Sequence, residues 1–225
     1  MIHLSGRKIS RQAEIAEAKK LDSGTESRVS RITLKYKERA RPIGGLVLKE
    51  ILGADQDPNW ADQQMRQVLE TWNLIVKINE RRNREKKTMF RLPGTIRGFQ
   101  DKKRIGILMT DLSDNGEKEI FDLKDLIYFS RDDLTMKDWQ SIKQQVLRDI
   151  EIAQEEAIDL DNGPEHVDPW LVVYDKVQKT YQVYLCDIGG YTHVYAPSSA
   201  NKVLLKKGKR NILHALKAIE QGMEE

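Results

Sequence analysis

The alternation of apolar and polar residues in the first half of the chain predicts two paired strands followed by a long helix. Residues 27–36 alternate imperfectly, and residues 43–51 form a short apolar stretch entered through a proline and two glycines. Both patterns are typical of strands. Asp57 and Pro58 then open a helix, because aspartate is a common N-cap and proline suits the first helical position. Apolar residues recur along this helix at intervals of three and four, at Met65, Val68, Leu69, Trp72, Ile75 and Val76.

The second half of the chain predicts more strands and two further helices. Residues 95–99 and 104–112 are expected to form two strands around a polar turn, and a polar connection follows residue 116. The pattern then predicts a long helix over residues 135–157, strands at 170–174 and 181–186, and a closing helix that carries Ile212 and Leu216. This mixture of strand and helix periods predicts an α+β fold.

Composition narrows the class of protein. At 225 residues and 39% hydrophobic content, the chain can bury a real core in one large or two-lobed domain. It has no apolar run of the ~18 residues that a membrane span needs, and its first residues are charged, so a cytoplasmic protein without a membrane partner is expected. The single cysteine, Cys186, cannot form an internal disulfide and is expected to be a buried thiol. Neither zinc-ligand spacing nor a hydrolase nucleophile motif is present.

The charge is nearly balanced overall but clustered locally. The 38 basic and 35 acidic residues leave a net charge of +3, which creates no global field that demands a polyanionic partner. Two basic runs stand out, one at Arg81, Arg82, Arg84, Lys86 and Lys87 and one at Lys206, Lys207, Lys209 and Arg210. Either run is a candidate nucleic-acid contact, although solvated helix ends explain the same residues more simply.

Three segments of the first half resemble conserved parts of protein kinases. Residues 24–29 are similar to the end of the glycine-rich loop, with one glycine where the family pattern has three. Residues 46–49, Leu-Val-Leu-Lys, resemble the third-strand motif, and residues 104–112 resemble the fifth strand and hinge. The resemblance implies a nucleotide site that contains Gly24, Ser27, Val29, Lys49, Glu70, Met109 and Asp111.

The resemblance also implies a role for each part of that site. Lys49 would hold the α- and β-phosphates of ATP, and Glu70, 21 positions later, would be its partner. Helical periodicity places Glu70 away from the apolar stripe, so the alternative is that it faces water. Met109 would guard the adenine pocket, and the backbone of residues 110–112, which includes Asp111, would bind the adenine edge.

Two acidic motifs in the second half resemble the kinase catalytic loop and metal-binding motif. His166-Val167-Asp168 is similar to His-Arg-Asp, and Asp187-Ile188-Gly189 is similar to Asp-Phe-Gly, 19 residues later. The resemblance implies that Asp168 is the catalytic base and that Asp187 holds Mg²⁺. Five residues after Asp168, the family's metal-binding asparagine is replaced by Val173. Asn162 lies upstream of Asp168 and could replace that asparagine only if the loop is rebuilt. An alternative register makes Asp159 or Asp161 the base.

Together these segments predict a protein-kinase-like fold with a strand-rich N-lobe over residues 1–112 and a shortened helical C-lobe over residues 113–225. The implied function is a small phosphotransferase that uses ATP and Mg²⁺, with an acceptor the sequence does not identify. The first alternative is an inactive pseudokinase-like scaffold that binds a protein partner, since the asparagine is missing and the glycine loop is reduced. The second is a nucleic-acid-binding α+β domain that uses the basic runs.

Overall fold

The computed structural model describes residues 9–10, 13–23, 27–36, 43–53, 56–94, 96–100, 104–128, 134–160, 167, 169–186, 193–194 and 199–224. The chain divides into two compact units, one of residues 1–76 and 93–115 and one of residues 77–92 and 116–225. The described part contains β-sheet in both units and three long α-helices, which confirms the α+β class. No helix in the described ranges has the length and apolar character needed to cross a membrane.

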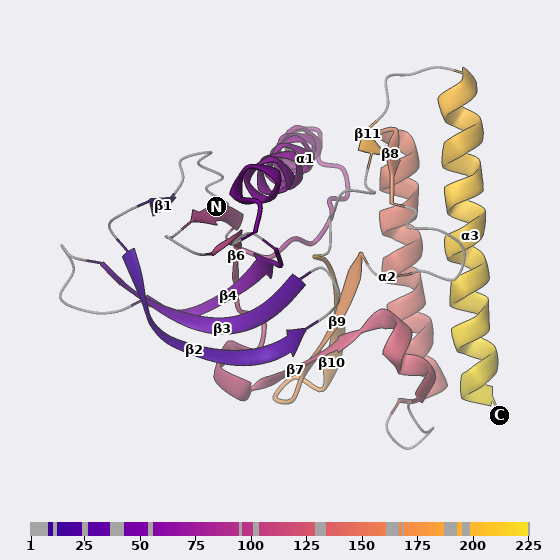
Figure 1. Ribbon diagram of the computed structural model, residues 1–225. Helices are drawn as coiled ribbons and strands as arrows, with labels where there is room; N and C mark the ends of the chain where they lie inside the picture. The colour runs from indigo at the N-terminus through magenta and orange to yellow at the C-terminus, as the bar shows by residue number, and fades with distance from the viewer. Residues whose placement is uncertain are drawn as a thin grey trace. The chain divides into compact units, whose positions relative to one another are not determined.

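The first unit is built on a six-stranded sheet with the order β1-β5-β6-β4-β3-β2. Its strands are β1 (Ile9–Ser10), β2 (Ala13–Ser23), β3 (Ser27–Tyr36), β4 (Ile43–Ile51), β5 (Ile96–Gln100) and β6 (Ile105–Thr110). Strands β2 to β6 pair antiparallel, and β1 adds a short parallel edge to β5. Strand β4 is therefore central, with β3 on one side and β6 on the other (Figure 1).

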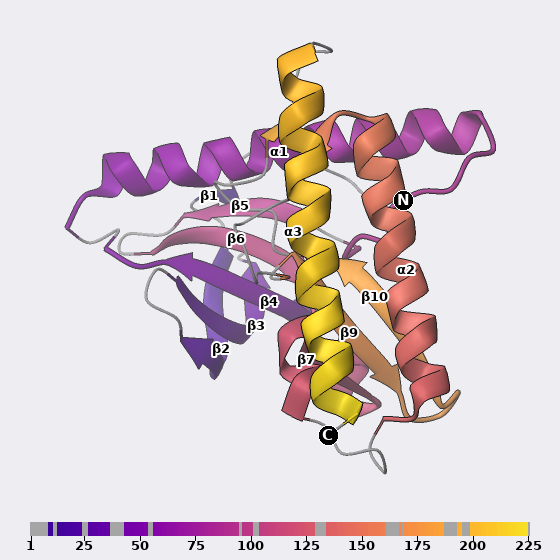
Figure 2. The same cartoon turned by 90° about the vertical axis from the view of Figure 1, so that its right-hand side faces the viewer.

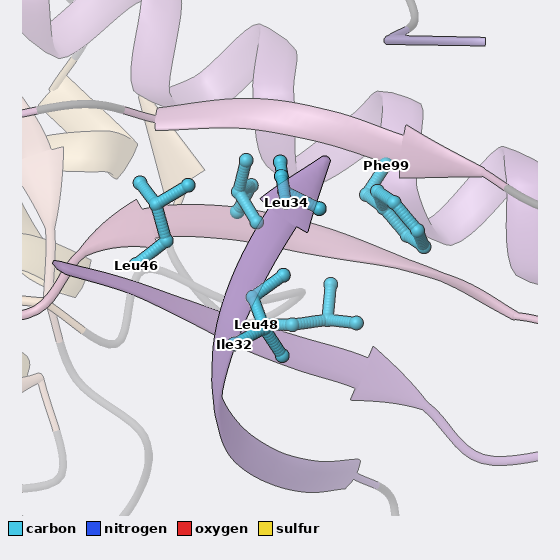
Figure 3. Close-up of a cluster of buried hydrophobic side chains, with 6 residues drawn as sticks. Ile32, Leu34, Leu46, Leu48 and Phe99 are labelled. Carbon is cyan, nitrogen blue, oxygen red and sulfur yellow. The ribbon is translucent and has the colours of Figure 1, made fainter. Parts of the chain in front are cut away.

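One face of this sheet carries a compact apolar core (Figure 3). The strands alternate as expected for a period of two, so that Leu46 and Leu48 of β4 point into the core while Val47 and Lys49 point to the opposite face. The buried cluster consists of Ile32, Leu34, Leu46, Leu48, Phe99 and Leu108. These side chains come from four strands, so their burial fixes how the strands are aligned.

The helix α1 (Pro58–Arg84) begins in the first unit and packs on the face that does not carry this core. A Cβ placed on Gly98 of β5 would lie 2.9 Å from Leu69 Cδ1 and 3.1 Å from Met65 Sδ, so these helical side chains rest directly on β5. Figures 1 and 2 show α1 running along this side of the sheet. The predicted cap is confirmed, because Asp57 Oδ1 accepts a hydrogen bond from the N–H of Trp60 at 3.0 Å.

The second unit combines a three-stranded sheet with two long helices. It contains β7 (Lys118–Asp122), α2 (Met136–Glu155), β8 (Ile158–Asp159), β9 (Trp170–Asp175), β10 (Thr180–Leu185), β11 (His193–Val194) and α3 (Ser199–Glu224). The sheet has the order β10-β9-β7, and β8 pairs separately with β11. Helices α2 and α3 run side by side in Figures 1 and 2, and Lys143 of α2 is ion-paired with Glu220 of α3 at 2.7 Å.

Several strands were not expected from the sequence. The segment that forms β2 is rich in alanine, glutamate and lysine, so its strand conformation depends on pairing with β3 rather than on its own propensity. The polar connection after residue 116 contains β7, which completes the sheet beside β9, and the short pair β8–β11 was also missed. The expected strands and helices are present, with ends shifted by a few residues.

A buried carboxyl group joins α2 to the sheet of the second unit. Asp149 Oδ2 accepts a hydrogen bond from Trp170 Nε1 at 2.9 Å, and both side chains are buried. Burial raises the pKa of Asp149 to about 7, although the Trp170 hydrogen bond and the charges of Arg148 and Arg91 act in the opposite direction. The folded unit therefore holds a proton at this site at pH values where an unfolded aspartate has lost it.

We expect the stability of the protein to fall as the pH rises from about 4 to about 7, through the raised pKa of Asp149. The folded state binds this proton more tightly than the unfolded state, so the stabilisation is complete below the ordinary pKa of 3.8 and is lost above the folded pKa of about 7. Asp149→Asn keeps an oxygen acceptor for Trp170 and removes the charge. Above pH 7 it should be more stable than the natural protein by an amount on the order of 1–4 kcal/mol.

Thermal unfolding followed by circular dichroism between pH 4 and pH 8 measures this effect. The matched control is Glu151→Gln on the exposed face of the same helix, which should leave the slope unchanged. A slope that is the same in Asp149→Asn and in the natural protein would contradict the assignment.

Candidate functional site

The strand register of the first unit places three of the seven predicted nucleotide-binding residues on one face of the sheet. Lys49 of β4 lies directly opposite Val29 of β3 and Ile107 of β6, and Val47 lies opposite Met109. Residues directly opposite each other in an antiparallel sheet project to the same side, as do alternate residues of one strand. Val29, Lys49 and Met109 therefore share a face, which we call the Lys49 face.

Helix α1 covers part of the Lys49 face. Gly98, which rests under Met65 and Leu69, lies opposite Ile107 and so belongs to the same side of the sheet as Lys49. The Lys49 side chain is half-buried there. Glu70, its predicted partner, is exposed on α1 next to the buried stripe, as the helical period indicated.

An ion pair crosses the Lys49 face close to Met109. Arg31 of β3 lies opposite Val47, and its guanidinium Nε donates to Asp111 Oδ2 while Nη2 donates to Ser113 Oγ at 2.6 Å. Asp111 directly follows β6, so the Arg31 side chain spans β4 to reach it. The Asp111 side chain is only 4% exposed, whereas that of Arg31 is 35% exposed. At this end of the Lys49 face, the Arg31 guanidinium is therefore ion-paired with the buried carboxylate of Asp111.

Asp111 is fixed from several directions. Its N–H donates to Gly45 O at 2.8 Å, and its Oδ1 accepts from the N–H of Ser113 at 2.9 Å. Burial raises the pKa of this carboxyl, but the hydrogen bonds from Ser113 and Arg31 and the charge of Arg31 outweigh burial and hold the pKa below its usual value. The N–H of Asp111 is used within the sheet, so this group does not contribute the adenine contact expected of the hinge; the other backbone groups of residues 110–112 keep that prediction.

Arg31 and Ser113 were missed by the sequence prediction. Arg31 stands in a strand with imperfect alternation, where the cations Arg28, Arg31 and Lys35 indicate only a half-solvated strand. Its partner Asp111 is 80 residues away, and only the order of β3, β4 and β6 brings the two together. Ser113 lies in a turn, and no local signal in the sequence connected its hydroxyl to Arg31.

The predicted acids of the second unit lie outside the described residues, but their chain neighbours are described. Trp170 at the start of β9 lies opposite Leu185 at the end of β10, and the N–H of Cys186 donates to Pro169 O at 2.8 Å. Pro169 directly follows Asp168 in the sequence, and Cys186 directly precedes Asp187. The two chain segments that lead to these acids therefore meet at one end of the β9–β10 hairpin.

Some of the remaining predicted residues are described by the structure and others are not. Gly24, Asp161, Asn162 and His166 also lie outside the described residues, and of Ser27 only the backbone in β3 is described. Asp159, the alternative base, lies in β8 opposite His193 of β11. Val173, which stands in place of the family's asparagine, is 2% exposed within β9. Among the described residues, no three His, Cys, Asp or Glu side chains are grouped to hold a metal ion.

Two members of the first basic run, Arg81 and Arg82, form ion pairs with the end of α2, whereas Arg84, Lys86 and Lys87 are exposed. Arg82 is 4% exposed; it donates to Thr88 O at 2.6 Å and pairs with Glu155 at 2.7 Å and Glu156 at 2.9 Å, and Arg81 also pairs with Glu156. Burial lowers the pKa of Arg82, but the two glutamates outweigh burial and raise it. These contacts lie within the second unit and attach the end of α1 to the end of α2.

A glycine on β6 sets the distance between the strands that carry Lys49 and Met109. A Cβ on Gly106 would lie 2.3 Å from Lys49 O and 2.9 Å from Glu50 Cα, which are backbone atoms that cannot rotate away. Gly106→Ala should therefore separate β4 from β6 and destabilise the protein by about 1–3 kcal/mol, lowering the midpoint of thermal unfolding by several degrees. Gly44→Ala is the matched control, because its nearest neighbour would be Thr33 Oγ1 at 3.9 Å. Equal midpoints for the two variants would contradict the close approach.

Comparison of the chain with protein families and with curated proteins found no relative. The chain matches no model of a protein family, and no curated protein is similar to it. Three features of the chain itself therefore bear on its function. One sheet face carries the half-buried Lys49 beside apolar side chains, and the Arg31–Asp111 ion pair lies at the end of that face. At one end of the β9–β10 hairpin, Pro169, which follows Asp168 in the sequence, is hydrogen-bonded to Cys186, which precedes Asp187.

Proposed function

We propose that this protein is a small phosphotransferase of kinase-like fold that uses ATP and Mg²⁺. The observation that carries the proposal is the Lys49 face, on which Val29, Lys49 and Met109 project together from three adjacent strands. The kinase resemblance assigns these three residues to the nucleotide, and the register gives them a common surface. The strand with Lys49 also neighbours the strand with Met109, as a shared pocket requires.

The residues of the Lys49 face suit the two ends of a nucleotide. Val29, Val47 and Met109 offer an apolar surface to a base, and Lys49 offers three N–H donors with a positive charge to phosphate oxygens. The Arg31–Asp111 pair lies beside Val47 and Met109, so the base would contact the planar guanidinium as well as the apolar side chains. Glu70 is the proposed partner of Lys49 when nucleotide is bound.

The acids of the second unit supply the chemistry in this proposal. Asp187 would hold Mg²⁺ against the phosphates. Asp168 would accept the proton of the acceptor hydroxyl while the hydroxyl oxygen bonds to the γ-phosphorus, the bond from that phosphorus to the β,γ-bridging oxygen breaks, and ADP leaves. The hydrogen bond between Pro169 and Cys186 favours this assignment, because each of these residues is bonded in sequence to one of the two acids. Asp159 and Asp161 remain the alternative bases.

The second candidate is a pseudokinase-like scaffold that binds nucleotide and a protein partner without transferring phosphate. Val173 favours it, because an apolar side chain buried in β9 cannot replace a metal-binding asparagine. In the register with Asp168 as the base, the second metal would lack that ligand. Incubation with γ-labelled ATP separates the candidates, since only the enzyme transfers label to itself or to an added acceptor or releases labelled phosphate.

Thermal unfolding with and without millimolar ATP and Mg²⁺ tests the nucleotide site itself. Nucleotide at 100 times its dissociation constant stabilises the folded state by roughly 2.7 kcal/mol, which raises the midpoint by about 5–10 °C. Lys49→Met and Asp187→Asn should each lose most of this shift. Lys35→Met, which removes an exposed lysine from the same sheet, should keep it. No shift in the natural protein, or an equal shift in all four proteins, would refute the proposed site.

A further inference from the structure

The structure separates the two basic runs of the sequence. In the first run, Arg81 and Arg82 are paired with Glu155 and Glu156 of the second unit, whereas the second run lies on α3, which has no acidic residue between Ser199 and Ile219. The exposed cations of α3 are Lys202, Lys206, Lys207, Arg210 and Lys217. None of these five forms an ion pair within the described part of the chain. In this respect they differ from Arg81 and Arg82, which glutamates of the second unit hold in place.

The exposed cations form a row along one side of α3. At 100° per residue, Lys202, Lys206, Arg210 and Lys217 fall within an arc of roughly 80°, and they span roughly 22 Å along the helix axis. The buried side of the helix is centred roughly 130° away from this row and packs in the second unit through Ile212, Ala215, Leu216, Ile219 and Met223. Packing of the apolar side thus turns the cationic row toward solvent.

The nearest acid on α3 does not neutralise this row. Glu220 lies one turn beyond Lys217, but its carboxylate accepts hydrogen bonds from Lys143 Nζ at 2.7 Å and from Gln140 Nε2 at 2.8 Å. The Lys143 hydrogen bond lowers the pKa of Glu220 despite partial burial, so this carboxylate is ionised and already paired with α2.

The chemistry of the row favours one kind of partner. We propose that the exposed side of α3 binds the phosphate backbone of a nucleic-acid duplex, in addition to the nucleotide site and independently of it. A duplex carries one negative charge about every 1.7 Å along its axis, so a straight row of lysine and arginine meets phosphates at any position. Helix α3 contains no Trp, Tyr or Phe, so it offers neither a stacking surface for unpaired bases nor the aromatic anchors typical of helices that lie on membranes.

Backbone contacts of this kind have a defined signature. Affinity should fall steeply with salt, with a slope of about −0.9 per phosphate contacted, and should vary little with base sequence. Four contacts give a slope near −4. The variant Lys206→Glu/Arg210→Glu removes two of them and adds two like charges, so we expect at least a tenfold loss of affinity and a slope reduced by about 2.

Fluorescence anisotropy with labelled 20-base-pair duplexes of two unrelated sequences, between 50 and 200 mM salt and without ATP, measures these quantities on the full chain. The matched control is Arg84→Glu/Lys86→Glu, which makes the same change in net charge at exposed positions of the first run. The control should bind the duplex within about twofold of the natural protein. Circular dichroism of both variants checks that each is folded.

Three outcomes would overturn the proposal. An equal loss in the α3 variant and the control would show that net charge alone drives binding. A single strand bound more tightly than the duplex would show that bases rather than the duplex backbone are contacted. Absence of duplex binding at 50 mM salt, with or without binding to vesicles that contain phosphatidylserine, would show that the row serves another partner. None of these outcomes depends on the Lys49 site, and a missing response to ATP would leave the duplex result unaffected.

Discussion

The register of β4 against β3 and β6 is the constraint on which the first unit depends. Alternate residues of β4 enter the apolar core, and the residues between them form the Lys49 face. Because the side-chain period of a strand is two, a slip of one residue would move Lys49 into the core and Leu48 to the opposite side. The burial of Leu46 and Leu48 therefore determines on which face of the sheet Lys49 lies. Gly106 allows β6 to approach β4 closely enough to keep this register.

Charge has a different role in the second unit. Arg82 and Asp149 are both buried, but Arg82 is accompanied by two glutamates and a carbonyl, whereas the closest polar partner of Asp149 is the indole N–H of Trp170. The guanidinium therefore stays charged, and the carboxyl holds its proton up to about neutral pH. Removing one partner from the arginine cluster leaves a buried charge unpaired, while neutralising Asp149 removes a charge that the fold disfavours.

The sequence predicted the helices and strands whose pattern of buried and exposed positions depends on residues close together in the chain. The N-cap of α1, its apolar stripe and the strands β3 and β4 follow from residues within a few positions of one another. Strand β2 could not be predicted in this way because its residues suit a helix, and only β3 makes it a strand. Lys49 and Met109 were predicted as site residues from short motifs and stay predictions, whereas the pairing of Arg31 was not predicted, because its partner lies two strands away in the sheet. The hydrogen bond between Cys186 and Pro169 could not be predicted from sequence spacing, because it depends on the β9–β10 register.

The Arg31–Asp111 pair also bears on how the first unit is assembled. The pair joins residues 80 positions apart and can form only when β3, β4 and β6 are already aligned. Because loop-closure entropy opposes contacts between distant residues, we expect this pair to form late in folding, after the main barrier has been crossed. An interaction that forms after the barrier slows unfolding much more than it speeds folding. We therefore expect the ion pair beside Met109 to lengthen the lifetime of the folded first unit.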